Sequence, residues 1–255
     1  MKKLTMTIGI LALLAGLSTY SVAAPDPNPG KTTATMTVAE LEKAADQARA
    51  EKDYQLAIDY FRIALRKDPK NAVLYNKLGM SELKKGDMYP ARSDFQKAAK
   101  LNPKYANALN NIGAVDFSQK KFGSAAKYFK KAVALEETTA TFHVNLGAAW
   151  FAQNKVERAI VEYTRALELD PDALNASSRT GVAAQITTPE ERAKYSYMLA
   201  KIYAQRGDVE SCLRCLRKAK EDGYRELANV YKDQEFASVR QDARLSELVP
   251  PPIAK

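Results

Sequence analysis

Prolines recur at one fixed interval through the middle of this chain. Pro69 and Pro103 lie 34 positions apart, Pro171 follows after twice that interval, and Glu137 occupies the position between them. A fixed period of about 20 to 50 residues is typical of repeat architectures, in which each unit packs only against its neighbours. The interval therefore predicts a stacked array of similar units.

When the chain is written in rows of this length, small and aromatic residues also fall into columns. Each row holds two stretches with apolar residues three and four positions apart, which predicts a pair of amphipathic helices. Small residues let the paired helices approach closely, and we expect the aromatic residue to fill the space toward the next row. The columns are Gly79, Gly113 and Gly147; Ala91, Ala125 and Ala159; and Phe61, Phe95, Phe129 and Tyr163.

These columns resemble the signature of the tetratricopeptide-repeat family in four consecutive rows. The resemblance implies an all-α fold, a right-handed α-solenoid of helical hairpins that bury their apolar faces against one another. After Asp170 the pattern is interrupted, and Thr188 to Glu191 predicts a new helix start with a cap, a first-turn proline and first-turn acids. A displaced hairpin follows it, and the C-terminal segment is expected to cap the array.

The predicted organisation is a leader, a spacer, four regular hairpins, an interruption, a fifth hairpin and a capping tail. The interruption could form one helix from Pro171 to Ala184, and the tail could form two short helices, around Tyr231 and from Phe236 to Leu248. This ending is similar to that of exported bacterial members of the family. The divisions are 1–23, 24–37, 38–171 (as 38–71, 72–105, 106–139 and 140–171), 172–188, 189–223 and 224–255.

The N-terminus has the three-part layout of a secretory signal peptide. Lys2 and Lys3 precede an apolar stretch from Ile8 to Leu17, and small residues follow. We expect cleavage between Ala23 and Ala24, which places the mature protein in the periplasm or outside the cell. The alternative is a retained anchor, because the uncharged stretch could just span a bilayer. A membrane contact is expected only in that case.

Polar residues at the helix starts predict where the second helices begin. Asp87 and Ser124 are placed to cap the second helices of their rows, and Pro90 falls in a first turn, where its missing N–H costs little. Gly207 and Asp208 complete an Arg-Gly-Asp tripeptide, but they fall at a hairpin turn, where Gly-Asp is expected. We interpret that tripeptide as a turn rather than an adhesion motif.

The resemblance implies a binding groove, since the first helices of successive repeats line the concave face in this family. Asparagine amides, with both donor and acceptor, would suit a peptide backbone, and apolar side chains beside them would form a ladder of anchors. The alternative is that these residues touch each other. The candidate groove residues are Asn76, Met80, Leu83, Asn107, Asn110, Asn111, Phe117, Val144, Asn145 and Phe151.

The family's clamp for C-terminal carboxylates does not carry over to this sequence. The clamp needs Lys at position five of a row and Asn at position nine, where this chain has other residues. Binding of chaperone C-termini is therefore not expected. Position five holds Glu42, Asn76, Asn110 and Val144, and position nine holds Asp46, Met80, Ala114 and Ala148.

Cysteine and histidine are the residue types in this chain that could indicate a redox, metal or catalytic site. Cys212 and Cys215 form a C-x-x-C without a thioredoxin context, and Cys212 falls at a small packing position, so packing is favoured over a redox or metal role. His143 is the sole histidine, and no second histidine or acidic cluster accompanies it. No phosphate-binding Gly-rich loop and no basic-aromatic nucleic-acid motif is present. We expect no catalytic site, no cofactor and no nucleic-acid partner.

The chain carries 39 basic and 30 acidic residues, a net charge of +9. Basic residues alternate with acidic ones, as where Lys127, Lys130 and Lys131 are followed by Glu136 and Glu137, so we interpret the surplus as a solvated helix face. The leading hypothesis is a non-catalytic scaffold or adaptor of the cell envelope that binds a peptide or helix of a partner in the groove. The alternatives are an envelope assembly factor that docks on a membrane complex through its convex or basic surface, and a redox accessory.

Overall fold

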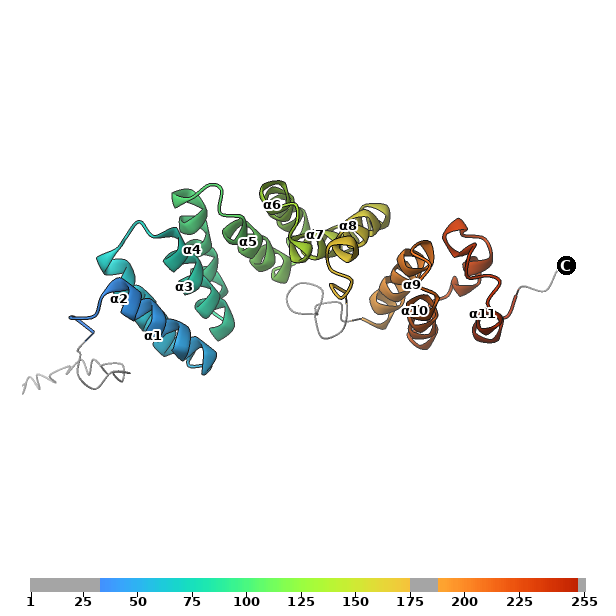
Figure 1. Ribbon diagram of the computed structural model, residues 1–255, viewed down its shortest axis with the longest axis horizontal. Coiled ribbons are helices and arrows are strands. Elements are labelled where there is room, and N and C mark those ends of the chain that lie inside the picture. Colours follow the sequence, from blue (N-terminus) through green and yellow to red (C-terminus); the bar gives the residue numbers. More distant parts are fainter. Residues whose placement is uncertain (1–32, 175–187, 252–255) are drawn as a thin grey trace, which may run out of the picture.

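The computed structural model describes residues 33–174 and 188–251, and every regular element in these ranges is helical. Ten α-helices form five consecutive pairs, and a short helical segment follows them (Figure 1). The pairs are α1 (Val38–Ala50) with α2 (Tyr54–Lys67), α3 (Ala72–Lys85) with α4 (Met88–Leu101), α5 (Ala106–Ser118) with α6 (Phe122–Leu135), α7 (Ala140–Phe151) with α8 (Val156–Leu169), and α9 (Pro189–Gln205) with α10 (Val209–Glu221).

Each row of the repeat between residues 38 and 171 contains one hairpin, and each hairpin packs on the next. The two helices of a pair contact each other most extensively, and the second helix of each row then contacts the first helix of the following row. The result is an elongated array in which hairpins succeed one another along the long axis (Figure 1). Such an array buries its apolar surface between neighbours rather than in one central core.

The close approach within a hairpin depends on a glycine in the first helix. A Cβ on Gly113 would lie 2.7 Å from the ring of Phe129, and a Cβ on Gly79 would lie 2.8 Å from the ring of Phe95. Both distances are too short for a real contact, so the ring occupies the space that a side chain would need. The aromatic residue therefore closes its own hairpin. Phe95 also belongs to the same apolar cluster as Ile112 and Val115 of the next row, which is consistent with the prediction that it fills the space toward that row.

The helix caps agree only in part with the sequence-based prediction. Thr188 forms a capping box with Glu191, and Pro189 begins α9, as predicted. Asp87 is the N-cap residue of α4, but its side chain makes no capping hydrogen bond. The prediction for Ser124 was wrong, because this residue lies inside α6 and its hydroxyl donates to Asp116 Oδ2 at 2.6 Å. The hydroxyl of Ser124 therefore bonds the buried carboxylate of Asp116 instead of capping the helix.

The C-terminal segment covers the end of the fifth hairpin. It contains the 3-10 helices η3 (Leu227–Tyr231) and η4 (Gln234–Phe236) and the short helix α11 (Ala243–Leu248). Phe236 and Leu245 are fully buried, in the same cluster as α9 and α10. The predicted helix from Pro171 to Ala184 falls largely outside the described residues.

No helix in the described part of the chain is both long and apolar enough to cross a membrane.

Candidate functional site

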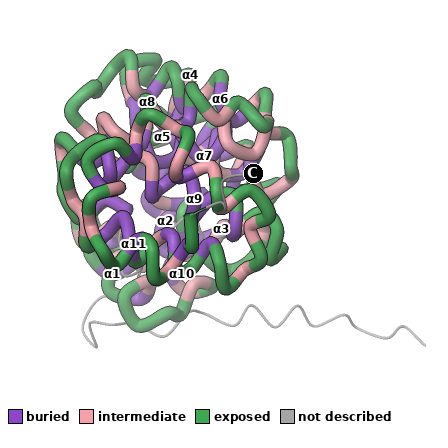
Figure 2. The backbone as a smooth tube through the Cα atoms, turned by 90° about the vertical axis from the view of Figure 1, so that its right-hand side faces the viewer, coloured by how far each residue is buried: buried purple, intermediate pink, exposed green. Residues whose placement is uncertain are grey.

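The first helices of the regular rows form one face of the array. Besides its contacts with neighbouring second helices, α5 directly contacts α3 on one side and α7 on the other. In the view along the long axis, α4, α6 and α8 lie at one edge, whereas α5 and α7 lie nearer the middle (Figure 2). We call the surface formed by α1, α3, α5, α7 and α9 the inner face.

Asparagine side chains connect the helices of the inner face. Asn111 Nδ2 on α5 donates to Asn76 Oδ1 on α3 at 2.9 Å. Asn145 Nδ2 on α7 donates to Asn110 Oδ1 on α5 at 2.8 Å. These bonds are rungs between consecutive repeats, and each rung joins residues 35 positions apart. The amides predicted to hold a ligand backbone therefore hold one another.

The burial of the ten predicted groove residues divides them into three groups. Five are buried, three are half-buried, and two are exposed. Those that are exposed or half-buried remain available to a ligand, and the buried ones form the floor. The buried residues are Asn76, Asn110, Phe117, Val144 and Asn145; the half-buried ones are Leu83, Asn111 and Phe151; the exposed ones are Met80 and Asn107.

Phe117 and Phe151 occupy equivalent positions but have different surroundings. Phe117 is 5% exposed, and its ring packs on Phe122 at a centroid distance of 4.9 Å, so it belongs to the core of its own hairpin. Phe151 is half-buried and meets the edge of Tyr195 on α9 at 5.5 Å. Of these two phenylalanines, Phe151 alone lines a cavity.

The inner face begins at its N-terminal end with a network of charges between α1 and α3. Lys77 Nζ lies 2.6 Å from both Glu42 and Asp46, and Arg49 lies 2.9 Å from Asp46. Although burial alone would lower the pKa of Lys77, its hydrogen bonds with the two carboxylates raise the pKa above the ordinary value. Arg49 also points to the sulfur of Met80, at 3.8 Å. This end is polar and internally neutralised.

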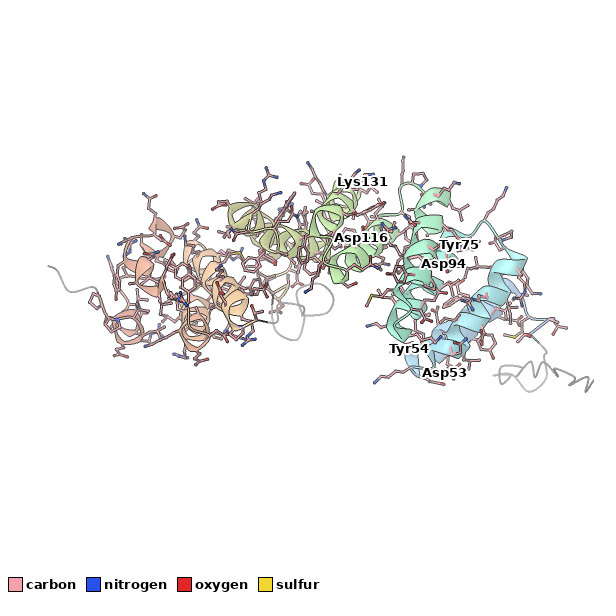
Figure 3. All side chains as sticks on the ribbon, turned by 180° about the vertical axis from the view of Figure 1, so that it is seen from behind. Asp53, Tyr54, Tyr75, Asp94, Asp116 and Lys131 are labelled. Atoms are coloured by element: carbon pink, nitrogen blue, oxygen red, sulfur yellow. The ribbon has the colours of Figure 1, made fainter. Side chains whose placement is uncertain are left out.

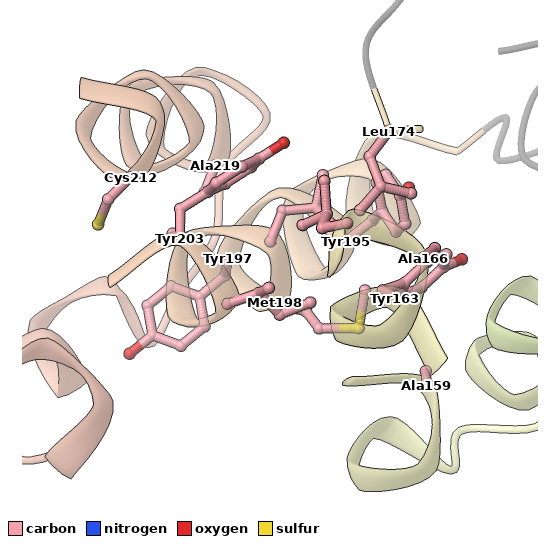
Figure 4. Close-up of a cluster of buried hydrophobic side chains, with 14 of the residues drawn as sticks. Ala159, Tyr163, Ala166, Leu174, Tyr195, Tyr197, Met198, Tyr203, Cys212 and Ala219 are labelled. Atoms are coloured by element: carbon pink, nitrogen blue, oxygen red, sulfur yellow. The ribbon is translucent and has the colours of Figure 1, made fainter. Parts of the chain in front are cut away.

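A cavity of about 340 Å³ lies at the other end of the inner face, where α7 and α9 meet the C-terminal cap. Aromatic and aliphatic side chains form its walls, and charged side chains stand among them. Figure 4 shows this part of the core, with Tyr195 and Met198 of α9 facing Tyr163 and Ala166 of α8. The lining residues are Phe151, Asn154, Val156, Lys194, Tyr197, Met198, Lys201, Tyr224, Glu226, Asn229 and Asp233.

Hydrogen bonds and ion pairs fix the side chains on the cap side of this cavity. The rings of Tyr197 and Tyr224 stack with their centroids 4.4 Å apart, and Tyr197 donates its hydroxyl to Asp233 at 2.9 Å. Lys201 Nζ lies 2.8 Å from Asp233 and 3.4 Å from Glu235. The walls are therefore held in place by a polar network, which is the condition for a preformed binding site.

Burial and the neighbouring carboxylates shift the pKa values of these groups. Burial and the bond to Asp233 both raise the pKa of Tyr197, so its hydroxyl stays protonated and keeps donating. Burial alone would lower the pKa of Lys201, but Asp233 and Glu235 raise it overall. Lys201 therefore stays charged in the wall of the cavity, beside Asp233 and the aromatic rings of Phe151, Tyr197 and Tyr224.

Of the residues that line this cavity, only Phe151 was predicted from the sequence as a binding residue. Tyr197 and Lys201 lie on α9, and Tyr224 and Asp233 lie in the cap, beyond the interruption of the repeat period. The aromatic residues around the fifth hairpin were a signal that could have been used, because aromatic side chains beyond the repeat columns are candidates for a separate site.

His143 and the cysteines have structural surroundings. His143 is 4% exposed and bonds Glu162 at 2.7 Å and the carbonyl oxygen of Glu137 at 2.9 Å. No disulfide joins Cys212 and Cys215, and burial raises the pKa of Cys212 to about 12. A redox thiol needs a lowered pKa, so this geometry does not favour the redox alternative. Within residues 33–174 and 188–251, no three His, Cys, Asp or Glu side chains are grouped for a metal ion.

The Arg-Gly-Asp tripeptide is a turn, as predicted. Gly207 has a positive φ of 74°, and Asp208 accepts a hydrogen bond from the Ser211 backbone as the N-cap of α10.

Two acidic residues at one repeat position have opposite environments. Glu82 and Asp116 occupy the same position in consecutive rows, and both are almost completely buried. Burial and the nearby carboxylate of Asp94 raise the pKa of Glu82 to about 7, although Arg62 lies 3.0 Å away. Burial alone would raise the pKa of Asp116, but bonds from Arg92 and Ser124 lower it below its ordinary value. Asp94 and Asp116 are labelled in Figure 3.

Family models place these hairpins among known repeats. Models of the tetratricopeptide repeat match residues 42–106, 76–138, 140–173 and 193–221, which together are more than half of the chain. The chain belongs to the tetratricopeptide-repeat family. The matches include all four regular rows and the displaced fifth hairpin of this tetratricopeptide-repeat protein, so the resemblance seen in the sequence is confirmed.

Solved structures of other tetratricopeptide-repeat proteins share the fold. MamA from Desulfovibrio magneticus RS-1 is 20% identical, with 72% of this chain and 93% of that chain covered and a TM-score of 0.52. YrrB is 20% identical (76% and 90% covered, TM-score 0.50), and TTC0263 from Thermus thermophilus is 19% identical (80% and 100% covered, TM-score 0.50). At these identities the likeness shows the α-solenoid fold alone, which confirms the predicted fold class. No curated protein matches the chain significantly.

Proposed function

We propose that this protein is a non-catalytic adaptor of the cell envelope that binds a peptide or helix of a partner protein along its inner face. The observation that carries the proposal is the cavity between α7, α9 and the C-terminal cap, with Phe151, Tyr197 and Tyr224 in its walls. Binding sites usually combine apolar walls with fixed polar groups, and this cavity contains both. The cavity continues the inner face, so one extended partner could use both.

The chemistry of the lining suggests what the partner offers. We expect an apolar side chain of the partner to pack against Phe151 and the stacked pair of Tyr197 and Tyr224, since such rings bury large areas with little loss of side-chain freedom. Lys194 is exposed at the edge of the cavity, and Glu226 stands on the opposite side, in the cap. A partner segment with one apolar anchor flanked by charged residues matches this arrangement. The solved structure of YrrB is described as having an unusual peptide-binding site, which supports peptide binding by this fold.

The proposal is tested by selecting peptides on the immobilised protein and measuring their dissociation constants by fluorescence polarisation. Phe151→Ala is expected to weaken a selected peptide by roughly tenfold or more, because truncation of a buried aromatic anchor costs at least about 1.4 kcal/mol. Lys194→Glu, at an exposed position, is expected to change the preference for charged residues beside the anchor.

Val161→Ala is the matched control, because Val161 is 65% exposed on α8 and does not line the cavity. It should leave the dissociation constant unchanged. Circular dichroism of every variant shows whether the helices remain, which separates lost binding from lost folding. If Phe151→Ala and Val161→Ala bind selected peptides as tightly as the parent, the cavity is not the binding site.

We also propose that the protein is exported and processed, on the basis of the leader-like segment and the small residues before Ala24. An export reporter fused after the spacer should be active only when this segment is present. Activity without the segment would contradict an envelope location.

A further inference from the structure

Most of the net positive charge of the chain lies between residues 88 and 135, on α4, on α6 and in the loops beside them. Residues 88–135 contain nine Lys and Arg residues but only two Asp and Glu residues, a net charge of +7 out of +9 for the chain. The two acidic residues are Asp94 and Asp116, which are 6% and 0% exposed and are paired with Lys97 and Arg92. The exposed charged residues of this segment are therefore all lysines.

These lysines do not follow the alternating pattern that the sequence analysis described. On α6, Lys127, Lys130 and Lys131 are three and four residues apart, all exposed, and α6 contains no acidic residue. Like charges at this spacing repel each other and destabilise a helix. By contrast, α8 alternates its charges, and Arg165 pairs with Glu168 at 2.9 Å. The exposed charges of α6 therefore do not alternate in sign, although Glu136 and Glu137 follow the helix directly.

The exposed lysines of α4 and α6 lie on one continuous surface. Ala99 of α4 packs against the same apolar cluster as Tyr128 and Val133 of α6, so the two helices lie close together there. The helices α4 and α6 lie at the same edge of the molecule in Figure 1, and Figure 3 labels Lys131 at that edge, where its ammonium group lies over the ring of Tyr128. We call the surface formed by Lys100 of α4, Lys104 of the loop after α4, and Lys127, Lys130 and Lys131 of α6 the basic face; Lys97 of α4 is left out because it is paired with Asp94.

Apolar side chains stand beside these charges. Leu101 at the end of α4 and Leu135 at the end of α6 are 41% and 40% exposed. They hold the same position in consecutive rows, so they lie at the same end of adjacent parallel helices. Each leucine is close in sequence to lysines of the basic face. Lysines beside exposed leucines are the composition of a surface that rests on anionic lipid.

We propose that the basic face binds the headgroups of an anionic bilayer, with Leu101 and Leu135 reaching the boundary of the acyl chains. The absence of exposed arginine supports lipid over a specific acidic protein site: Arg92, the only arginine of residues 88–135, is already paired with Asp116. A lysine ammonium is a compact point charge that suits a diffuse anionic surface, whereas arginine suits bidentate recognition of a carboxylate. Because the basic face belongs to the second helices, the inner face stays open while the protein is on the membrane.

The proposal is tested by sedimenting the full-length protein with vesicles of phosphatidylcholine alone, and with vesicles that also contain phosphatidylglycerol. We expect binding that increases with the anionic lipid and falls with added salt. The comparison of the two compositions isolates the charge-dependent part, even if the N-terminal segment binds lipid by itself. Equal binding to both kinds of vesicle, or none to either, would overturn the proposal.

The variant Lys127→Glu/Lys130→Glu/Lys131→Glu reverses three charges of the basic face. It should lower the charge-dependent partition by roughly tenfold or more, since each basic residue near an anionic surface contributes about 1 kcal/mol. The control reverses three exposed lysines elsewhere, Lys43, Lys84 and Lys218, and has the same net charge. It should retain most of the binding. Equal losses in both variants would mean that only net charge matters, which overturns a specific face.

Lys100→Glu/Lys104→Glu, at the end of α4 and in the loop after it, provides a second test if the α6 variant does not fold, as judged by circular dichroism. A loss of several-fold is expected from these two charges. Binding to polyglutamate but to neither kind of vesicle would assign the basic face to an acidic protein partner instead, and the lipid proposal would be wrong.

Discussion

Glu82 should make the stability of the first two hairpins depend on pH. Its side chain is 1% exposed, its Oε2 atom has no hydrogen-bond partner among the described residues, and its pKa is raised to about 7 from an ordinary value of 4.5. An acid with a higher pKa in the folded state stabilises the fold when protonated. This contribution is complete below about pH 4.5 and is lost as the pH rises through about 7.

The magnitude follows from the difference between the two pKa values. Each pKa unit corresponds to about 1.4 kcal/mol, so the contribution lost between about pH 4.5 and pH 8 is at most about 3 kcal/mol. Glu82→Gln has the same shape but cannot ionise. The free energy of unfolding of this variant, relative to the parent, should therefore rise by up to about 3 kcal/mol between pH 5 and pH 8.

The measurement is urea unfolding followed by far-ultraviolet circular dichroism at several pH values. Asp116→Asn is the matched control, because Asp116 occupies the same repeat position but has a lowered pKa. It stays ionised over this range, so its loss should destabilise the protein by roughly 2–4 kcal/mol at every pH. A difference between Glu82→Gln and the parent that does not change with pH would refute the reasoning, because Glu82 would then titrate as an ordinary carboxyl.

Three further predictions concern the hairpins, the cysteines and the leader. Gly113→Ala should lower the free energy of unfolding by about 1–3 kcal/mol in urea unfolding, because its Cβ would meet the Phe129 ring at 2.7 Å. Gly123→Ala, with nothing within 4 Å of the added Cβ, should have no such cost. In the native protein iodoacetamide should leave Cys212 unmodified, as read by mass spectrometry, because burial raises its pKa to about 12; rapid modification would contradict the burial. N-terminal sequencing of the exported protein should begin at Ala24, and a sequence beginning at Met1 would show a retained anchor.

The hairpins were predictable because their determinants repeat. Gly113 and Phe129 recur with the same spacing in other rows, and a period shared by several rows leaves few alternative arrangements for the helices. Helix caps were less predictable, since a hydroxyl such as that of Ser124 has more than one acceptor within reach. In this fold the acceptor is Asp116, which lies eight residues away and is buried in the same hairpin.

The candidate site was predictable only in outline. Repeat positions indicated that Asn110 and Asn145 point toward the inner face, but not that the two helices approach closely enough for the amides to bond. That distance depends on how tightly successive hairpins pack, which no single row encodes. The walls formed by Tyr197, Tyr224 and Asp233 join segments outside the repeat period, so the spacing of residues contained no information about their contact.

The packing of successive hairpins sets the distance between consecutive first helices, and the asparagine hydrogen bonds hold α3, α5 and α7 at that distance, which limits how a ligand can lie across them. Packed helices are about 8–10 Å apart, and an extended peptide advances about 3.3 Å per residue, so about three ligand residues pass over each helix. An extended ligand that crosses the four first helices of the uninterrupted rows would therefore be about a dozen residues long. A partner whose contacts repeat at a different interval would need α5 and α7 to move apart, and this movement would break the hydrogen bond between Asn110 and Asn145.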